Sequence, residues 1–586
     1  MSALLSIENL SVAFRSEKNI NPAVNGINIA VNKGELVAIV GESGSGKSVT
    51  CMSVLQLLTS ASTIYAAGKI ITNVKDYDGN LLNASAKQLQ AIRGNRIAMV
   101  FQEPMSSLNP VMRCGNQVAE AILQHKKITA AEAKQQTIDL FDKVKLPNPP
   151  AIYERYPHQL SGGQKQRVMI AMAMSCQPDL LICDEPTTAL DATVQQSILL
   201  LLKQLQQEQQ LGVVFITHDL GVVAEIADHV AVMYKGQIVE TGAMADIFNQ
   251  PKHPYTKALL ACRPTEKSKG KRLPVVADFL SDNGLQTTDD RQHAELQNQS
   301  NAENNNQPLN DTNHTSYIIH HASPLLNVKD LNIWYPTKKN LLGKTTDYFK
   351  AVNGVSFDVL QGETLGLVGE SGCGKSTLGR CLLQLLPATN GHIFYKERDL
   401  ATVSTKELTR LRQEMQVIFQ DPFGSLNPRI RIGEAISEPL LVHNIEPSQQ
   451  KRKEKAIEWL EKVGLKAEHY NRYPHEFSGG QRQRIVIARA LILNPSFVVC
   501  DEAVSALDVS VQAQVLNLLN DLKREMGFTN IFISHNLAVV HYISDRIMVM
   551  QKGQIEEIGT ADEVYFSPKS EYTKKLIAAI PGAKIN

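Results

Sequence analysis

The sequence predicts an α/β fold built twice in one chain, and three observations predict it. A glycine-rich loop follows a short apolar strand and precedes a helical pattern at residue 41 and again at residue 369. Longer motifs also recur: RYPHQLSGGQ returns as RYPHEFSGGQ, and ICDEPTTALD returns as VCDEAVSALD. At 586 residues the chain is too long for one hydrophobic core.

The repeat keeps its register closely over most of its length. Ser161 and Ser478 are 317 positions apart. The tail segments HPYTKALLA and EYTKKLIAA, around Tyr255 and Tyr572, keep the same offset. Only the glycine-rich loops differ, because an insertion around LLGKTTDYFK places the second loop further along the chain. The sequence therefore predicts two homologous domains.

Residues 265–325 separate these predicted domains, which span 1–264 and 326–586. Within residues 285–316, Asn and Gln supply twelve of 32 residues, whereas large apolar residues supply three. Such a segment buries too little apolar surface to offset the entropy of ordering it. We expect a flexible Asn/Gln-rich linker that keeps the two domains at a high effective concentration.

The composition is that of an ordinary globular protein, with 20% charged and 43% hydrophobic residues. The formal net charge of +1 offers no global attraction for nucleic acid or an anionic membrane. Eight scattered cysteines suit a reducing compartment. The start MSALLSIENLSV has no secretory pattern, and no apolar run approaches the roughly 20 residues of a membrane span. We therefore expect membrane contact only through a partner.

The two glycine-rich loops, GESGSGKS and GESGCGKS, are phosphate-binding loops. Their glycines let backbone amides wrap a phosphate chain, and the following helix N-terminus adds a favourable dipole. Lys47 and Lys375 would reach the outer phosphates, and Ser48 and Ser376 would ligate Mg²⁺. The residues predicted to bind nucleotide in these loops are Gly41, Gly44, Gly46, Lys47, Ser48, Val49, Gly369, Gly372, Gly374, Lys375, Ser376 and Thr377.

The segments LSGGQ and FSGGQ, each followed by a helical pattern, resemble the signature of ABC ATPases. The resemblance covers nearly the whole chain apart from the linker. It implies two P-loop ABC-type nucleotide-binding domains, each a RecA-like core with a helical subdomain and an antiparallel β subdomain. The signature residues that it implies for nucleotide binding are Ser161, Gly162, Gly163, Gln164, Ser478, Gly479, Gly480 and Gln481.

The resemblance also implies roles for residues at strand ends. It assigns the general base to Glu185 and Glu502, with His218 and His535 as switch histidines near the γ-phosphate. The implied magnesium-binding residues are Ser48, Gln102, Asp184, Ser376, Gln420 and Asp501. Gln102 and Gln420 would also touch the membrane subunits, and Asp191 and Asp508 would lie across the dimer seam. An aromatic ring that stacks on adenine is assigned to Phe14 and Tyr335, with Trp334 beside the latter.

In this family the two domains pack head to tail. One ATP site would therefore join Lys47 and Glu185 to the second signature, and the other would join Lys375 and Glu502 to the first. Neither copy lacks any of these motif residues, so we predict two hydrolytically competent sites that use ATP and Mg²⁺. ATP favours the closed pair, and hydrolysis lets the halves part.

Finer sequence features resemble the bacterial peptide-importer branch: SSLNP, GSLNP, RYPHQLSGG and HPYTKALLA. Within it, the fused two-domain form most resembles ATPases of glutathione importers, with dipeptide, oligopeptide and microcin-peptide importers as alternatives. The resemblance implies two permease subunits and, through them, a periplasmic or lipid-anchored binding protein. It also implies a peripheral location on the cytoplasmic face of the inner membrane.

Two cysteines lead to separate expectations. Many peptide-importer ATPases carry several cysteines after the domain that resemble an iron–sulfur site, but only Cys262 lies in that region, so we predict no cluster. Cys373 replaces Ser45 in the second loop. A helix N-terminus lowers a thiol pKa and would make Cys373 reactive; the alternative is a small residue filling a small slot.

A rival class is the soluble tandem ABC protein that acts on ribosomes, which carries a basic helical linker. Residues 265–325 contain five Lys or Arg against eight Asp or Glu, which argues against an RNA-binding arm. DNA-repair ABC ATPases insert long coiled coils or zinc-binding cysteines, and neither pattern is present. We predict no nucleic-acid partner.

Overall fold

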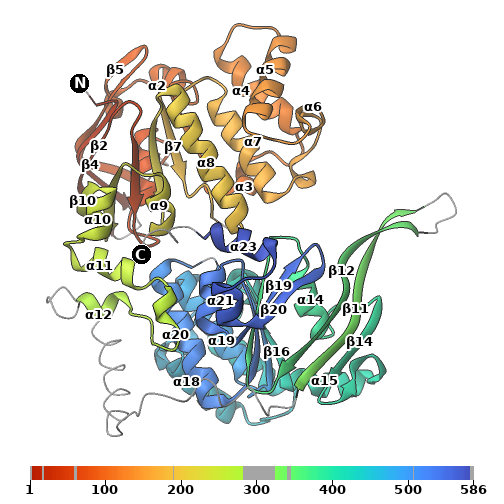
Figure 1. Ribbon diagram of the computed structural model, residues 1–586. Helices are drawn as coiled ribbons and strands as arrows, with labels where there is room; N and C mark the ends of the chain where they lie inside the picture. Colours follow the sequence, from red (N-terminus) through yellow and green to blue (C-terminus); the bar gives the residue numbers. More distant parts are fainter. Residues whose placement is uncertain are drawn as a thin grey trace. The chain divides into compact units, whose positions relative to one another are not determined.

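The computed structural model describes residues 3–15, 19–58, 62–188, 190–280, 324–339, 345–505 and 507–580 (Figure 1). Its contacts divide the chain into two units. The first ends at Leu260, and the second runs from Ala261 to Ile580. Within the described ranges, every helix is too short or too polar to cross a bilayer.

The first unit is centred on a six-stranded sheet in the order β10-β9-β3-β8-β7-β6. All neighbours pair in parallel except β10 with β9. The central strand β3 reads LVAIV and is buried along its whole length, as expected for a parallel strand covered on both faces. The strands are β3 (Leu36–Val40), β6 (Ile97–Val100), β7 (Leu180–Asp184), β8 (Gly212–Thr217), β9 (His229–Tyr234) and β10 (Gln237–Ala243).

A second, antiparallel sheet packs against it in the order β2-β1-β4-β5. One hydrophobic core joins the two sheets and includes Leu5, Ile39 and Ile216. Its strands are β1 (Leu5–Arg15), β2 (Ile20–Val31), β4 (Thr63–Val74) and β5 (Tyr77–Asn80).

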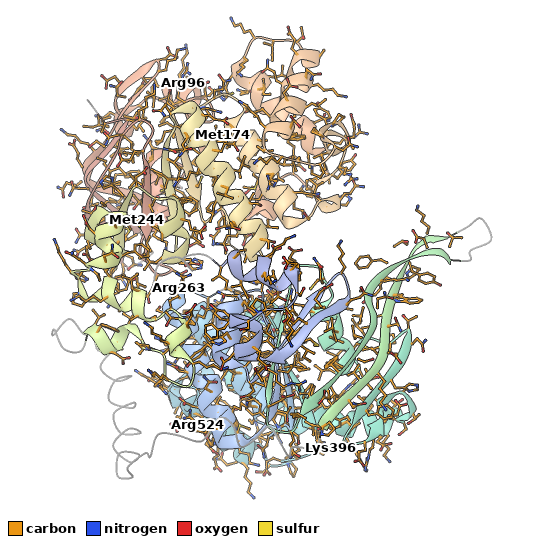
Figure 2. The ribbon with its side chains drawn as sticks, viewed as in Figure 1. Arg96, Met174, Met244, Arg263, Lys396 and Arg524 are labelled. Atoms are coloured by element: carbon orange, nitrogen blue, oxygen red, sulfur yellow. The ribbon has the colours of Figure 1, made fainter. Side chains whose placement is uncertain are left out.

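Helices surround the first unit's sheets and supply its helical subdomain between β6 and β7. Met174, labelled in Figure 2, is the last residue of α7 and is buried. The helices are α1 (Lys47–Val54), η1 (Leu81–Asn83), α2 (Ala86–Ile92), α3 (Pro104–Ser107), α4 (Cys114–His125), α5 (Ala130–Lys143), α6 (Pro149–Tyr153), η2 (Pro157–Gln159), α7 (Gly162–Met174), α8 (Ala192–Gln209), α9 (Leu220–Ile226), α10 (Met244–Asn249) and α11 (Pro254–Ala261).

The second unit repeats this plan, with sheets in the orders β16-β17-β18-β13-β19-β20 and β12-β11-β14-β15. One hydrophobic core again joins the two sheets and includes Leu326, Leu367 and Met550. The strands are β11 (Pro324–Lys339), β12 (Thr345–Leu360), β13 (Thr364–Val368), β14 (Asn390–Tyr395), β15 (Arg398–Asp399), β16 (Met415–Ile418), β17 (Phe497–Asp501), β18 (Thr529–Ile533), β19 (Arg546–Gln551) and β20 (Gln554–Thr560).

The helices of the second unit follow the same order as those of the first. They are α14 (Lys375–Leu382), η5 (Leu400–Thr402), α15 (Thr405–Glu414), α16 (Pro422–Ser425), α17 (Ile432–Val442), α18 (Gln449–Lys462), η6 (Ala467–Asn471), η7 (Pro474–Glu476), α19 (Gly479–Leu491), α20 (Val509–Met526), α21 (Leu537–Ile543), α22 (Ala561–Phe566) and α23 (Glu571–Ala578). The predicted α/β fold class, duplicated and with helical and antiparallel β subdomains, is confirmed.

The predicted linker begins with folded structure. Residues 265–280 carry η3 (Glu266–Ser268) and α12 (Val276–Leu280), and the contacts assign them to the second unit. The division between the units thus falls at Ala261, whereas the sequence placed the start of the linker at residue 265. Residues 281–323, which form the rest of the expected flexible linker, lie outside the described residues.

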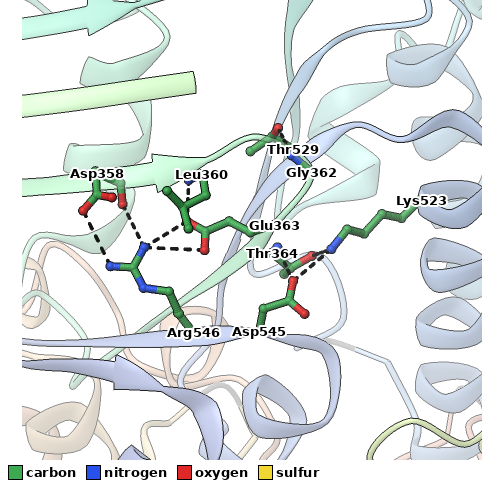
Figure 3. Close-up of polar contacts among 9 residues, drawn as sticks. All are labelled: Asp358, Leu360, Gly362, Glu363, Thr364, Lys523, Thr529, Asp545 and Arg546. Atoms are coloured by element: carbon green, nitrogen blue, oxygen red, sulfur yellow. Dashed lines mark hydrogen bonds and ion pairs between the residues drawn. The ribbon is translucent and has the colours of Figure 1, made fainter. Parts of the chain in front are cut away.

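Charged side chains hold α20 to the edge where β13 begins (Figure 3). Lys523 Nζ, on α20, donates to Thr364 Oγ1 at 2.8 Å and lies 3.2 Å from Asp545 Oδ2. The same Asp545 oxygen accepts the Thr364 amide at 2.7 Å. Beside them, Arg546 donates to Glu363 Oε1 at 3.2 Å. The Lys523 contacts join α20 to the first residue of β13 and to the residue directly before β19.

Candidate functional site

Each phosphate loop connects a buried strand to a helix and holds its lysine. The first helix begins after Gly46, whose φ of 104° is left-handed and suits glycine. Lys47 Nζ donates to Gly41 O at 2.7 Å and to Glu42 O at 2.8 Å, and Lys47 is 4% exposed. Lys375 donates to the matching two carbonyls of its own loop, at 2.7 and 2.9 Å. Both ammonium groups are therefore set inside their loops.

Next to each lysine, a hydroxyl meets a carboxylate from a neighbouring strand. Ser48 Oγ donates to Asp184 Oδ1 at 3.0 Å, and Ser376 Oγ donates to Asp501 Oδ1 at 2.6 Å. Burial raises the pKa of Asp184, although the bond from Ser48 acts in the opposite direction. Hydroxyl and carboxylate oxygens are the hard ligands that Mg²⁺ takes, so these pairs fit a magnesium ion.

Glu185 follows directly after β7 with a φ of 46°, a left-handed conformation that is rare for a residue with a side chain. Its Oε2 receives three partners from three different segments. Gln102 Nε2 donates at 3.3 Å, Thr188 Oγ1 donates at 2.9 Å, and His218 Nδ1 lies 3.2 Å away. The predicted base, Q-loop and switch residues of the first copy thus come together around one oxygen.

The second copy repeats the arrangement. Glu502 has a φ of 51°. Its Oε2 accepts Gln420 Nε2 at 2.9 Å and lies 3.5 Å from His535 Nδ1. Burial alone would raise the pKa of Glu502, but the hydrogen bond and charge of His535 and the charge of Lys375 lower it overall; the same opposing causes lower the pKa of Glu185. Both carboxylates are therefore ionised at neutral pH.

The two signature segments are helix starts. Ser161 caps α7: its Oγ accepts the Gln164 amide, and Gln164 Oε1 accepts the Ser161 amide, forming a capping box. Gly163 lies against the first turn of α8, where an added Cβ would meet Val194 Cγ1 at 2.5 Å. Ser478 and its own signature repeat this geometry at α19. The serine amide and hydroxyl and the glycine backbone are thus held at the front of a helix, where the dipole favours an anion.

The remaining predicted residues lie on other elements. Asp191 Oδ1 caps α8 by accepting the Val194 amide at 3.0 Å, and Asp508 precedes α20. Phe14 is half-buried at the end of β1, and Tyr335 is 40% exposed on β11. Both aromatic residues belong to the antiparallel sheets rather than to the sheets that carry the phosphate loops.

The structure adds a tyrosine to each loop. The hydroxyl of Tyr255, on α11, accepts the amide of Glu42 at 3.0 Å, and the hydroxyl of Tyr572, on α23, accepts the amide of Glu370 at 3.0 Å. Both tyrosines lie in the repeated tail segments, for which the sequence predicted no role. The carbonyl of Glu42 also accepts a hydrogen bond from Lys47, so Glu42 connects Tyr255 to the lysine. The one feature of the sequence that could have pointed to these tyrosines is that they recur at the 317-residue offset of the repeat.

Tyr255→Phe together with Tyr572→Phe is expected to raise the ATP KM about fivefold and to change kcat little, because one neutral hydrogen bond contributes about 1 kcal/mol. Steady-state ATPase assays would measure both constants. Tyr77→Phe is the control, since the Tyr77 hydroxyl also makes one bond, to Asn80 O at 3.1 Å in the antiparallel sheet. A fall in kcat at unchanged KM would contradict this prediction.

The cysteines of interest are buried. Cys373 is 6% exposed, and burial raises the pKa of its thiol although the charge of Lys375 acts in the opposite direction. The expected lowering of this pKa is therefore wrong, and the small-residue alternative is the better account. Cys262 is also buried. Across the described ranges, no three His, Cys, Asp or Glu side chains are grouped to hold a metal by themselves.

Comparison with known proteins adds independent findings. A family model described as "ABC transporter" matches residues 24–188 and 352–505, and one described as "Oligopeptide/dipeptide transporter, C-terminal region" matches residues 239–280. The chain is 46% identical over 585 residues to "Glutathione import ATP-binding protein GsiA" of Pectobacterium atrosepticum, covering 99% of this chain and 90% of that protein. The protein of the same name from Escherichia coli K12 is 46% identical over 588 residues with the same coverage.

Solved structures give a further likeness. The dimeric post-hydrolysis state of the ATP-binding cassette MJ0796 bound to ADP and Pi is 27% identical, with a TM-score of 0.37. The similarity covers 40% of this chain and 98% of that chain.

Proposed function

The chain belongs to the ABC transporter family as an ATPase coupled to transport, and on that premise we propose that it hydrolyses ATP at two composite sites to power import of glutathione or short peptides. Relatives 46% identical over nearly the whole chain are named for glutathione import, and residues 239–280 match an oligopeptide and dipeptide transporter region. The observation that carries the proposal is the duplicated convergence of glutamine and histidine on one carboxylate oxygen.

The phosphate loops bind ATP. Lys47 and Lys375 are held at the loop carbonyls and turn from these to the outer phosphates, whose charge is greater. Loop amides and the helix N-terminus bind the remaining phosphate oxygens. Ser48 with Asp184, and Ser376 with Asp501, would hold Mg²⁺, Asp184 and Asp501 through water. The ion neutralises charge on the β- and γ-phosphates when it is bound.

Glu185 and Glu502 act as general bases. Because the donors converge on Oε2, we assign acceptance of the water proton to Oε1. The lowered pKa keeps each carboxylate ionised and ready to accept. The left-handed backbone turns each glutamate out of its strand toward this task. His218 and His535 hold the carboxylates in place and stand near the γ-phosphate.

The signature of one cassette completes the site of the other. Each unit has one phosphate loop, one base and one capped signature helix, so a head-to-tail pair makes two sites of identical composition. Ser161 and Gly163 would serve Lys375 and Glu502, and the second signature would serve the first loop. Donors from both sides stabilise charge on the γ-phosphate, and hydrolysis removes that stabilisation.

Removing the histidines tests how the carboxylates are tuned. With His218→Ala and His535→Ala together, the acid limb of the ATPase pH profile is expected to shift to higher pH, beyond any loss of rate. The histidines lower the pKa of Glu185 and Glu502, so without them the carboxylates become ionised only at higher pH. Thr188→Val, which removes a weaker contribution to Glu185, should shift it less. If the ATPase rate falls at every pH but the acid limb stays at the same pH, the histidines do not tune the pKa of these carboxylates.

Permease subunits are the partners that the family implies. Large apolar side chains are exposed between the Q-loop and the end of the helical subdomain in both copies: Phe101, Val111, Leu123, Phe419, Phe423, Leu441, Val442 and Ile445. A surface of this kind suits a protein partner. We assign it to the cytoplasmic loops of two permeases, which would place the chain on the cytoplasmic face of the bacterial inner membrane and link it to a binding protein.

Val111→Asp is expected to reduce uptake by the assembled transporter about tenfold or more, because a charge in an apolar contact weakens docking. ATPase of the isolated subunit should fall far less, since Val111 is 82% exposed. Leu200→Asp, at another exposed aliphatic side chain, is the matched control for surface charge. Equal losses of uptake for the two variants would argue against the assigned surface.

Uptake by the complete transporter tests the function itself. The chain is combined with its permeases and binding protein in vesicles and offered labelled glutathione or a labelled dipeptide. ATP-dependent uptake establishes the importer, and the preferred label names the cargo. Hydrolysis of ATP with neither label entering would reject the proposed cargo. The relatives are named for import, so they give no support to the hypothesis of a tandem ABC protein that acts on ribosomes.

A further inference from the structure

The second unit contains residues that the sequence assigned to the end of the first domain and to the start of the linker. The matched peptide-transporter region runs to residue 280, yet residues 261–280 belong to the second unit by their contacts. In Figure 1 this yellow-green segment runs through α12 beside α20 and α21. We name residues 261–280 the clasp.

A side chain of α20 binds the backbone of the clasp through two hydrogen bonds. The side-chain amide of Asn517 accepts the amide of Leu273 at 3.0 Å and donates to the carbonyl of Leu273 at 2.8 Å. Leu273 is 1% exposed and Asn517 is 3% exposed. One turn further along α20, Asp521 pairs with Arg272 at 2.6 Å. Two buried hydrogen bonds to one residue fix the register of the clasp as well as its position.

The clasp also contacts α21 and α22. The Tyr542 hydroxyl donates to Lys271 O at 2.9 Å. Lys269 Nζ lies 2.8 Å from Asp562 Oδ1, and that oxygen is also 2.7 Å from His541 Nε2. Further along the clasp, Val275, Val276 and Leu280 are buried, with exposures of 4%, 8% and 1%. Polar contacts and buried apolar side chains are thus spread along the clasp from Lys269 to Leu280.

Only the second copy is built to receive it. At the position 317 residues before Asn517 stands Leu200, which is 62% exposed, and before Tyr542 stands Glu225. The leucine side chain has no amide group with which to bind a peptide backbone. The two copies otherwise match closely, so this difference marks a surface specific to the second cassette.

The helices that receive the clasp lead away from the second copy's reaction residues. Helix α20 begins directly after Asp508, and α21 begins two residues after His535. Lys523 anchors α20 to β13 (Figure 3), and Arg524, labelled in Figure 2, follows it. The clasp therefore contacts a helix that is anchored to the central sheet of the second cassette.

We propose that the clasp is an interface that fastens the two cassettes together without any contribution from the covalent path through residues 281–323. Chain that leaves the first cassette at Leu260 is built into the second cassette within the next 20 residues. The second unit also contains β11, which begins at Pro324. This inference concerns how the cassettes are joined and holds for any cargo.

Nicking the full-length protein tests this interface. A site-specific protease sequence is inserted within residues 285–316, and the purified protein is cut to completion, as verified on a denaturing gel. Gel filtration in EDTA without nucleotide then excludes ATP-driven pairing. The two fragments are expected to co-elute. Separation of the parent fragments would overturn the proposal.

Two variants locate the contact. Leu273→Asp alters only the clasp, and Asn517→Leu installs the first copy's residue; each is expected to weaken fragment association by about 100-fold, as loss of a central contact does. Leu200→Asn, the reciprocal change in the first copy, should leave it intact. Circular dichroism and ATP binding before nicking show that each variant is folded. Fragments of both clasp variants that co-elute as tightly as the parent would also overturn the proposal.

Discussion

Replacing both Glu185 and Glu502 with glutamine is expected to lower the ATPase rate by about 10²- to 10⁴-fold while ATP still binds, because general-base catalysis contributes a factor of that size. Glutamine keeps the size of the side chain and its contact with Gln102 or Gln420, but it has no carboxylate to take a proton. Phosphate release and nucleotide binding, measured on the same preparations, separate the two effects.

The single variants report on the two sites separately. Both copies surround their carboxylate with a Q-loop glutamine and a switch histidine, so each single substitution should remove at least half of the activity. Glu208→Gln, an exposed carboxylate on α8, is the control and should leave the rate unchanged. A single variant with the full parental rate would show that its site does not turn over, and the prediction of two competent sites would fail.

Replacing Lys47 and Lys375 with alanine is expected to weaken ATP binding by about 100-fold at each site, because hydrogen bonds to charged groups contribute about 1.5–3 kcal/mol. Each lysine is 4% exposed, and two loop carbonyls hold its ammonium group before it meets phosphate. Its loss also leaves those carbonyls without their donor. Titration with a fluorescent ATP analogue measures the dissociation constants directly.

Lys134→Ala is the control for general loss of positive charge, since Lys134 is half-exposed on α5 and pairs with Glu154. It should bind ATP as the parent does. If alanine at Lys47 and Lys375 leaves the dissociation constant within about twofold, the two lysines do not contact phosphate, and the loops bind by backbone amides alone.

The sequence by itself determined the fold class, the duplication and the family. Short motifs carry this information because their chemistry is local: glycines, a lysine and a helix start must follow a strand in fixed order to bind a phosphate chain. The same locality placed Glu185 and Glu502 at strand ends. Their convergence with Gln102, Gln420 and the histidines is what their predicted roles require.

Only the tertiary structure decided which distant residues meet. Tyr255 binds the loop amide of Glu42 from 213 positions away, and Leu273 binds Asn517 from 244 positions away. No local pattern encodes such a pair, because each partner's own neighbourhood is satisfied by many sequences. Residues 265–280 are polar and charged enough to suggest a flexible linker, yet a few buried apolar side chains and a single asparagine hold them. Burial of that kind depends on the surface that receives the segment, so composition alone could not predict it.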